Sequence, residues 1–130
     1  MYSIVDLEAT GGKFNEESII EIAIYKYDGS KVIDQFISLV NPHKDITSYV
    51  EKLTGISAKM VNTAPTFSQV AKRIIEITDN SILVAHNAQF DYRLLQIEFD
   101  RLGYEYIKES ICTVILSQNL LPNRESYKLG

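Results

Sequence analysis

The stretch SIVDLEATGG, residues 3–12, places two carboxylates in an apolar segment that ends in a glycine turn. Side chains alternate between the two faces of a β-strand, so Asp6 and Glu8 point to one face while Val5 and Leu7 point to the other. Two carboxylates on one face repel each other unless a cation or protons offset their charge. The pair therefore fits a cation site, but it fits equally two solvated acids at the end of a strand.

A second acidic segment, ILVAHNAQFD at residues 82–91, indicates a strand followed by a helix with Asp91 in its first turn. The helix dipole stabilises a carboxylate there by about 0.3–1 kcal/mol, so Asp91 also has a purely structural explanation. If this strand lies beside the first, Asp91 meets Asp6 and Glu8 at the carboxyl ends of the strands, where α/β sheets bind ligands. Three carboxylates there favour Mg²⁺ or Mn²⁺, which prefer oxygen ligands, and no Cys/His cluster indicates zinc.

The order of strand and helix patterns predicts an α/β fold, with a mixed β-sheet flanked by helices. Strands are expected at residues 4–7, 17–27, 30–40 and 81–85, and helices from 66, at 88–103, at 113–121 and near 48–56. Asp28-Gly29 is typical of a hairpin turn, and Thr66 with Gln69 is typical of a capping box. Asn87 is the expected N-cap of its helix. The continuous apolar run at 81–85 predicts a strand covered on both faces.

Composition excludes several classes of protein. The 130 residues, with 45% hydrophobic and 23% charged residues, predict one globular domain spanning residues 1–130. The net charge of −4 argues against a strongly basic surface that binds nucleic acid, although not against nucleic-acid binding through metal ions. A single cysteine, Cys112, and the lack of a secretory signal or a membrane-length apolar run lead us to expect a cytoplasmic protein without membrane contact.

The two acidic motifs resemble those of the DEDD 3′–5′ exonucleases, the DnaQ-like proofreading group. IVDLEATGG is similar to the first motif of that family, and VAHNAQFD to the second. The segments IIEIAIY, LTGIS and PTFSQVAKRI also resemble the family in the same order, so the resemblance spans nearly the whole chain. Ala9 departs from the family, where a threonine is frequent. The resemblance implies a ribonuclease H-like fold and a metal-dependent 3′–5′ exonuclease of the His-containing subgroup.

By this resemblance, Asp6, Glu8 and Asp91 are catalytic residues that hold two Mg²⁺ or Mn²⁺ ions. One ion activates a water and the other stabilises the leaving 3′ oxygen of the phosphodiester. The products are nucleoside monophosphates released from the 3′ end of single-stranded DNA or RNA, in proofreading or repair.

The resemblance also implies residues that contact the substrate. Thr10 and Gly11 match a turn that lies against the terminal nucleotide, and Thr54 matches a position that faces its sugar or base. His86 and Asn87 belong to the second motif, and we expect them to order the loop beside the substrate rather than to catalyse.

The third motif of the family, a His followed five residues later by an Asp, has no counterpart, since no His follows His86. We therefore expect an incomplete exonuclease domain that lacks its C-terminal helix and is nearly inactive alone. We also expect an exposed apolar face that allows self-association, and a polymerase or nuclease domain as a partner. The alternative function is a non-catalytic nucleic-acid-binding or scaffolding module of the same fold.

Overall fold

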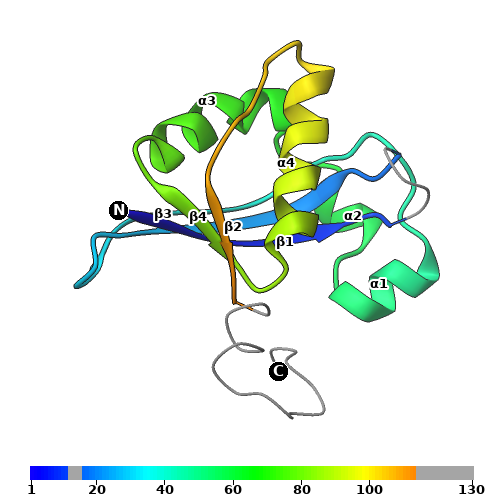
Figure 1. Cartoon of the computed structure of the whole chain (residues 1–130). Helices are drawn as coiled ribbons and strands as arrows, with labels where there is room; N and C mark the ends of the chain where they lie inside the picture. The colour runs from blue at the N-terminus through cyan, green and yellow to red at the C-terminus, as the bar shows by residue number, and fades with distance from the viewer. Residues whose placement is uncertain (12–15, 114–130) are drawn as a thin grey trace.

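The computed structural model describes residues 1–11 and 16–113, which form a five-stranded sheet in the order β3-β2-β1-β4-β5 (Figure 1). The strands are β1 (Tyr2–Ala9), β2 (Ile19–Tyr27), β3 (Val32–Leu39), β4 (Ile82–Ala85) and β5 (Ser110–Cys112). β1, β2 and β3 pair in antiparallel fashion, whereas β4 runs parallel to β1 and β5 runs parallel to β4. The helices are α1 (Ser48–Thr54), α2 (Ala58–Val61), α3 (Phe67–Thr78) and α4 (Ala88–Arg101). The predicted mixed sheet with flanking helices is confirmed.

The hairpin between β2 and β3 turns where the sequence predicts it. The Asp28 carboxylate accepts hydrogen bonds from the N–H groups of Ser30 and Lys31, at 2.8 and 2.9 Å. Gly29 has φ +99°, a backbone conformation that residues with a Cβ rarely adopt. The turn chemistry of these residues therefore fixes the register of the hairpin.

Helices α3 and α4 lie on the same face of the sheet and form the main core with it (Figure 1). The helix α3 begins after Thr66, whose N–H donates to Gln69 Oε1 at 2.9 Å, as the predicted capping box requires. Phe67 of α3 meets Phe99 of α4 edge to face, with ring centroids 5.0 Å apart, and Tyr106 stacks on Phe99 at 4.5 Å. These aromatic contacts join the two helices above the sheet.

The opposite face of the sheet is only partly covered by the described residues. In β4, Leu83 and Ala85 are buried, but Ile82 and Val84 are half-buried, so the prediction that this strand is covered on both faces is wrong. Further apolar side chains on this face are exposed, among them Ile4, Ile37 and Ile111, by 37–54%. Whether a strand is covered on its second face depends on distant segments, which the strand's own sequence does not specify.

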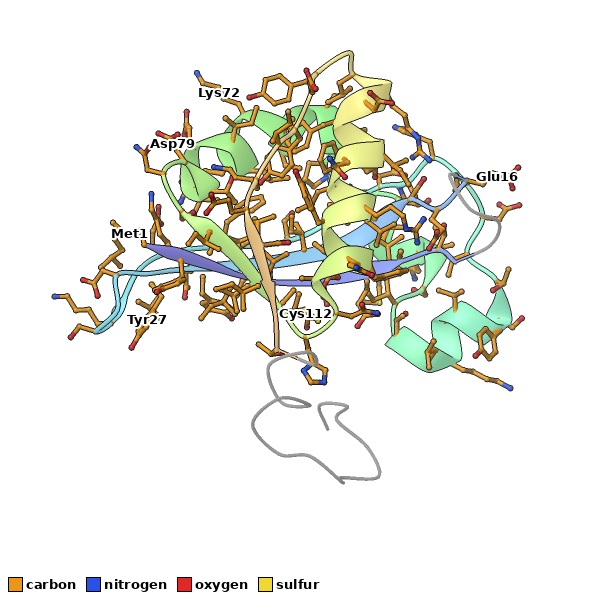
Figure 2. All side chains as sticks on the ribbon, viewed as in Figure 1. Met1, Glu16, Tyr27, Lys72, Asp79 and Cys112 are labelled. Carbon is orange, nitrogen blue, oxygen red and sulfur yellow. The ribbon has the colours of Figure 1, made fainter. Side chains whose placement is uncertain are left out.

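The strand β5 was not predicted, because its three residues are too few to show a period. The helix predicted at residues 113–121 falls almost wholly outside the described residues. Met1 and Tyr27 lie toward one end of the sheet and Glu16 toward the other (Figure 2). Within residues 1–11 and 16–113, no helix has the length and apolar character needed to cross a membrane.

Candidate active site

The first two acids lie on β1 as the alternation predicts. Val5 and Leu7 are buried in the core, whereas Asp6 is exposed and Glu8 is half-buried on the other face. The register between β1 and β2 places Glu8 directly opposite Glu21. Negative charge therefore accumulates at this end of the strand pair.

The third acid arrives from the neighbouring strand. β4 lies parallel to β1 and ends at Ala85, and α4 begins three residues later. Leu94 and Leu95 are fully buried in the core and anchor this helix against the sheet. The first turn of α4 therefore holds Asp91 at the carboxyl ends of β1 and β4, as the sequence predicts.

Asp6, Glu8 and Asp91 line one cleft of about 570 Å³ at these strand ends. Its other lining residues are Ile4, Val5, Leu7, Val84, Ala85, His86, Asn87, Phe90 and Thr113. The cleft thus combines the two acidic motifs, which are more than 70 residues apart in the chain. Thr113 belongs to neither motif, and no local signal in the sequence marks it.

The charges in this cleft are not compensated within the described part of the chain. Asp91 is 9% exposed, and burial, with the charges of Asp6 and Glu8, raises its pKa from 3.8 to about 7. Burial also raises the pKa of Glu8, followed by the charges of Asp6 and Glu21. None of the ion pairs found among residues 1–11 and 16–113 includes any of these acids. The cleft therefore favours an added cation or bound protons.

A divalent cation fits the chemistry of these three oxygen donors and would offset their repulsion. In the part of the chain that the structure describes, no three His, Cys, Asp or Glu side chains are already grouped closely enough to hold one ion. To hold one ion together, the side chains of Asp6, Glu8 and Asp91 would have to come closer to one another than the structure places them.

His86 is held from the end of β5. Its Nδ1 forms a 2.7 Å hydrogen bond with the hydroxyl of Thr113, and the Cys112 thiol lies 3.7 Å from its carbonyl oxygen. Its Nε2 is buried and has no hydrogen-bond partner among the described residues. Asn87 is the N-cap residue of α4, but its side chain makes no capping bond, so only the position of the predicted cap is confirmed.

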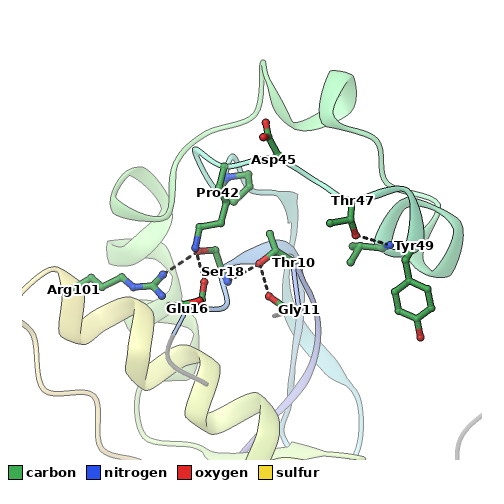
Figure 3. Close-up of a pocket in the computed structure, with 11 residues that line it drawn as sticks. Thr10, Gly11, Glu16, Ser18, Pro42, Asp45, Thr47, Tyr49 and Arg101 are labelled. Carbon is green, nitrogen blue, oxygen red and sulfur yellow. Dashed lines mark hydrogen bonds between the residues drawn. The ribbon is translucent and has the colours of Figure 1, made fainter. Parts of the chain in front are cut away.

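The other predicted substrate residues lie outside this cleft. Thr10 and Gly11 line a second cleft, of about 790 Å³, beyond the end of β1 (Figure 3). Thr54 lines neither cleft, and its hydroxyl donates to the carbonyl of Val50 at 2.8 Å and accepts from the N–H of Ile56 at 3.1 Å. The structure thus brings the three acids together with His86 and Asn87, but not with Thr54.

A family model described as exonuclease, of the RNase T type, matches residues 3–130. The chain is 35% identical over 128 residues to the PolC-type DNA polymerase III of Caldanaerobacter subterraneus subsp. tengcongensis, covering 98% of the chain and 9% of that protein. It is 33% identical over 130 residues to the 3′-5′ exonuclease DinG of Bacillus subtilis, covering 98% of the chain and 14% of that protein. The chain thus spans a small part of the length of these relatives.

Solved structures agree with this assignment. Exonuclease X, in complex with 5′ overhanging duplex DNA, superposes with a TM-score of 0.75 at 29% identity over 95% of this chain and 66% of its own. Exonuclease I, in complex with an inhibitor, superposes with a TM-score of 0.80 over 95% of this chain and 31% of its own; at 16% identity it shows the shared fold alone. Exonucleases of this kind use divalent metal ions. The chain therefore belongs to the exonuclease family, as an exonuclease domain homologous to a 3′–5′ exonuclease and to PolC-type DNA polymerase III.

Proposed function

We propose that this chain is the catalytic part of an enzyme that hydrolyses single-stranded DNA from its 3′ end and releases nucleoside monophosphates. The observation that carries the proposal is the convergence of Asp6, Glu8 and Asp91 in one cleft whose negative charge is uncompensated among the described residues. If these acids served only to stabilise a helix start or a strand end, they would have no reason to line the same cleft.

In this proposal, Asp6, Glu8 and Asp91 hold Mg²⁺ or Mn²⁺. When bound, two such ions supply an activated water and stabilise the leaving 3′ oxygen. By holding the ions, the carboxylates would set the position of the scissile phosphate. Without ions, their own negative charge would repel that phosphate. His86, tied to Thr113, fixes the loop between β4 and α4 beside the phosphate.

DNA is the proposed substrate because the two relatives described above are a DNA polymerase and a 3′–5′ exonuclease, and exonuclease X is in complex with DNA. A single strand is proposed because the terminal nucleotide must leave any duplex to bring its phosphate into the acidic cleft. The net charge of −4 supports a local grip through cations rather than an extended basic surface.

We propose that the domain acts within a longer protein, since its relatives with polymerase and exonuclease names are much longer than this chain. The 130-residue chain alone is proposed to be nearly inactive, because no His follows His86 to serve as the general base. Loss of a positioned base costs about 10²–10⁴-fold in rate. In the tests of this proposal, the full-length protein is the longer protein in which we propose that the domain acts.

The test is a 5′-labelled single-stranded DNA oligonucleotide incubated with Mn²⁺. The samples are the full-length protein, its Asp6→Asn and Asp100→Asn variants, and the 130-residue chain. Asp100 is the matched control, because it is an exposed acid on α4 outside the cleft. We expect a one-nucleotide ladder from the full-length protein and from Asp100→Asn only. No ladder from any sample would contradict the proposal and favour a binding module of the same fold.

A parallel assay with an RNA oligonucleotide of the same sequence tests the choice of substrate. We expect slower degradation of RNA than of DNA by the full-length protein. Equal or faster RNA degradation would contradict the DNA assignment while leaving the exonuclease assignment intact.

A further inference from the structure

Two further buried acids, Glu98 on α4 and Glu17 just before β2, have cationic partners on α4. Glu17 and Glu98 are 6% and 7% exposed. Arg93 Nη1 lies 2.9 Å from Glu17 Oε1, and Arg101 Nη1 lies 3.0 Å from Glu98 Oε1. We call these four residues the Glu–Arg clamp.

The clamp binds α4 to the beginning of β2. Glu98 Oε2 accepts a hydrogen bond from the N–H of Ile19 at 3.1 Å. Arg101 donates to the Ser18 hydroxyl at 3.0 Å and to the Glu17 carbonyl at 2.8 Å. Residues 17–19 are therefore held by side chains from the C-terminal half of α4.

The beginning of β2 in turn holds the turn that follows β1. The N–H of Ser18 donates to the Thr10 hydroxyl oxygen at 3.1 Å, and the N–H of Thr10 donates to the Ser18 carbonyl at 2.9 Å. The Thr10 hydroxyl donates to the Gly11 carbonyl at 3.3 Å. Figure 3 shows this connection from Arg101 through Ser18 to Thr10 and Gly11.

We propose that Glu98 and Arg101 are positioning residues, which hold the Thr10–Gly11 turn beside the cleft of about 790 Å³ that it lines together with Arg101. That cleft begins two residues beyond Glu8, and we propose that it receives the terminal nucleotide whose phosphate lies in the acidic cleft. Because that turn contacts substrate only under the proposed exonuclease activity, the inference rests on that activity. The same helix carries Asp91 at its start, so α4 sets the nucleotide-binding turn and the acidic cleft relative to each other.

The chemistry of the clamp supports a positioning role. The pair joins the buried Glu98 carboxylate to an Arg101 side chain that is 37% exposed. Such a pair stabilises a fold little more than apolar packing does, because the buried charge loses its hydration. The charged side chains instead provide hydrogen bonds of fixed geometry. The guanidinium of Arg101 donates to the Ser18 hydroxyl and to the Glu17 carbonyl, and both carboxylate oxygens of Glu98 accept hydrogen bonds. Apolar packing would not fix the backbone of the turn in this way.

The clamp should affect substrate binding more than the chemical step. The acids of the cleft are positioned by other contacts, through Val5 and Leu7 on β1 and Leu94 and Leu95 on α4. Loosening the clamp therefore moves Thr10 and Gly11 while the three carboxylates keep their supports. This separation predicts a higher KM with kcat nearly unchanged.

The experiment compares Glu98→Gln and Arg101→Lys in the full-length protein. Glu98→Gln keeps an oxygen for the Ile19 N–H but removes the charge opposite Arg101. Arg101→Lys keeps the charge but loses the fork. The matched control is Arg73→Lys, which removes the fork of an ion pair, 2.8 Å long, between α3 and Asp34 of β3. The readouts are hydrogen–deuterium exchange by mass spectrometry, and KM and kcat on 5′-labelled single-stranded DNA.

We expect faster exchange at Thr10, Ser18 and Ile19 in both clamp variants, with KM raised ~10-fold and kcat within ~2-fold of wild type. Arg73→Lys should change none of these quantities. Unchanged exchange in both clamp variants would overturn the clamp itself. Faster exchange with an unchanged KM, or with a fall in kcat alone, would overturn its role in placing the nucleotide.

The two proposals fail in different ways. If the wild-type full-length protein does not degrade DNA, the proposed activity fails, and the positioning role fails with it. If the wild type degrades DNA and the clamp variants have its KM, only the inference about Glu98 and Arg101 fails.

Discussion

Helix α4 buries one carboxylate near each end, and the two differ in their neighbours. Glu98 is 7% exposed and Asp91 is 9% exposed, so burial does not distinguish them. Glu98 has Arg101 and the N–H of Ile19 as partners. Asp91 has the like charges of Asp6 and Glu8 beside it, which together with burial raise its pKa to about 7. The difference shows that charge compensation, rather than burial, separates a structural acid from a candidate ligand.

The two acids therefore contribute to stability with opposite signs at neutral pH. The charge of Glu98 is compensated within the fold, so removing its partner should destabilise the protein. The charge of Asp91 lacks such compensation in the described residues, so its burial lowers the free energy of unfolding until a cation binds. Four predictions test this contrast.

The largest effect is expected on activity. Asp91→Asn in the full-length protein should lower the initial rate of DNA hydrolysis ~10³-fold, because it removes a charge that holds the cation. Asp100→Asn, which removes an exposed charge from the same helix, should leave the rate near that of the wild type. A loss of less than tenfold in Asp91→Asn would remove Asp91 from the catalytic centre.

The next effect is on folding of the 130-residue chain. Arg101→Met should lower the free energy of unfolding by about 3 kcal/mol, because it leaves the Glu98 carboxylate buried without its cation. Urea-induced unfolding followed by circular dichroism measures this change. A variant as stable as the wild type would show that Glu98 gains nothing from Arg101.

A smaller effect of opposite sign is expected for Asp91→Asn. The pKa of Asp91 is about 7 in the folded chain against 3.8 for the unfolded reference, so the folded state binds more protons between these values. The contribution of Asp91 to wild-type stability therefore falls as pH rises from 4 to 8, and an asparagine at this position escapes that loss. We expect Asp91→Asn to be more stable by about 2 kcal/mol at pH 8 in EDTA, and equal to the wild type near pH 4. Urea unfolding at both pH values measures the difference in unfolding free energy between Asp91→Asn and the wild type. If that difference did not change with pH, the raised pKa of Asp91 would not be its cause.

The smallest effect is expected at the surface. Arg73 and Asp34 form an ion pair with side chains 37% and 42% exposed. Arg73→Met should leave the urea midpoint nearly unchanged, because solvent screens such pairs. A loss as large as that of Arg101→Met would show that burial of the partner is not what sets the cost.

The sequence predicts those parts of the molecule whose signal is local. The alternation of Asp6 and Glu8 with Val5 and Leu7 follows from the strand period, and the Asp28-Gly29 turn follows from its own side chain. Asp91 lies near Asp6 and Glu8 only because β4 pairs with β1. That pairing is predicted from the topology rules for such sheets together with the family resemblance, and not from either strand alone.

The features that the sequence does not reveal depend on contacts between distant segments. Glu98 and Arg101 contact residues 79 to 84 positions away, and no period or motif marks those partners. Thr113 reaches His86 only because the short strand β5 pairs with β4. The half-buried side of β4 depends in the same way on which other segments cover it.

The measurement that tests the central claim most directly is isothermal titration of Mn²⁺ into the 130-residue chain and its Asp6→Asn, Asp91→Asn and Asp100→Asn variants at pH 7. Repetition in two buffers of different ionisation enthalpy reports the protons released on binding. We predict that the wild type and Asp100→Asn bind Mn²⁺ and release protons, because Asp91 is partly protonated at this pH. Both cleft variants should bind much more weakly. Equal binding by all four proteins would contradict the assignment of Asp6 and Asp91 as ligands.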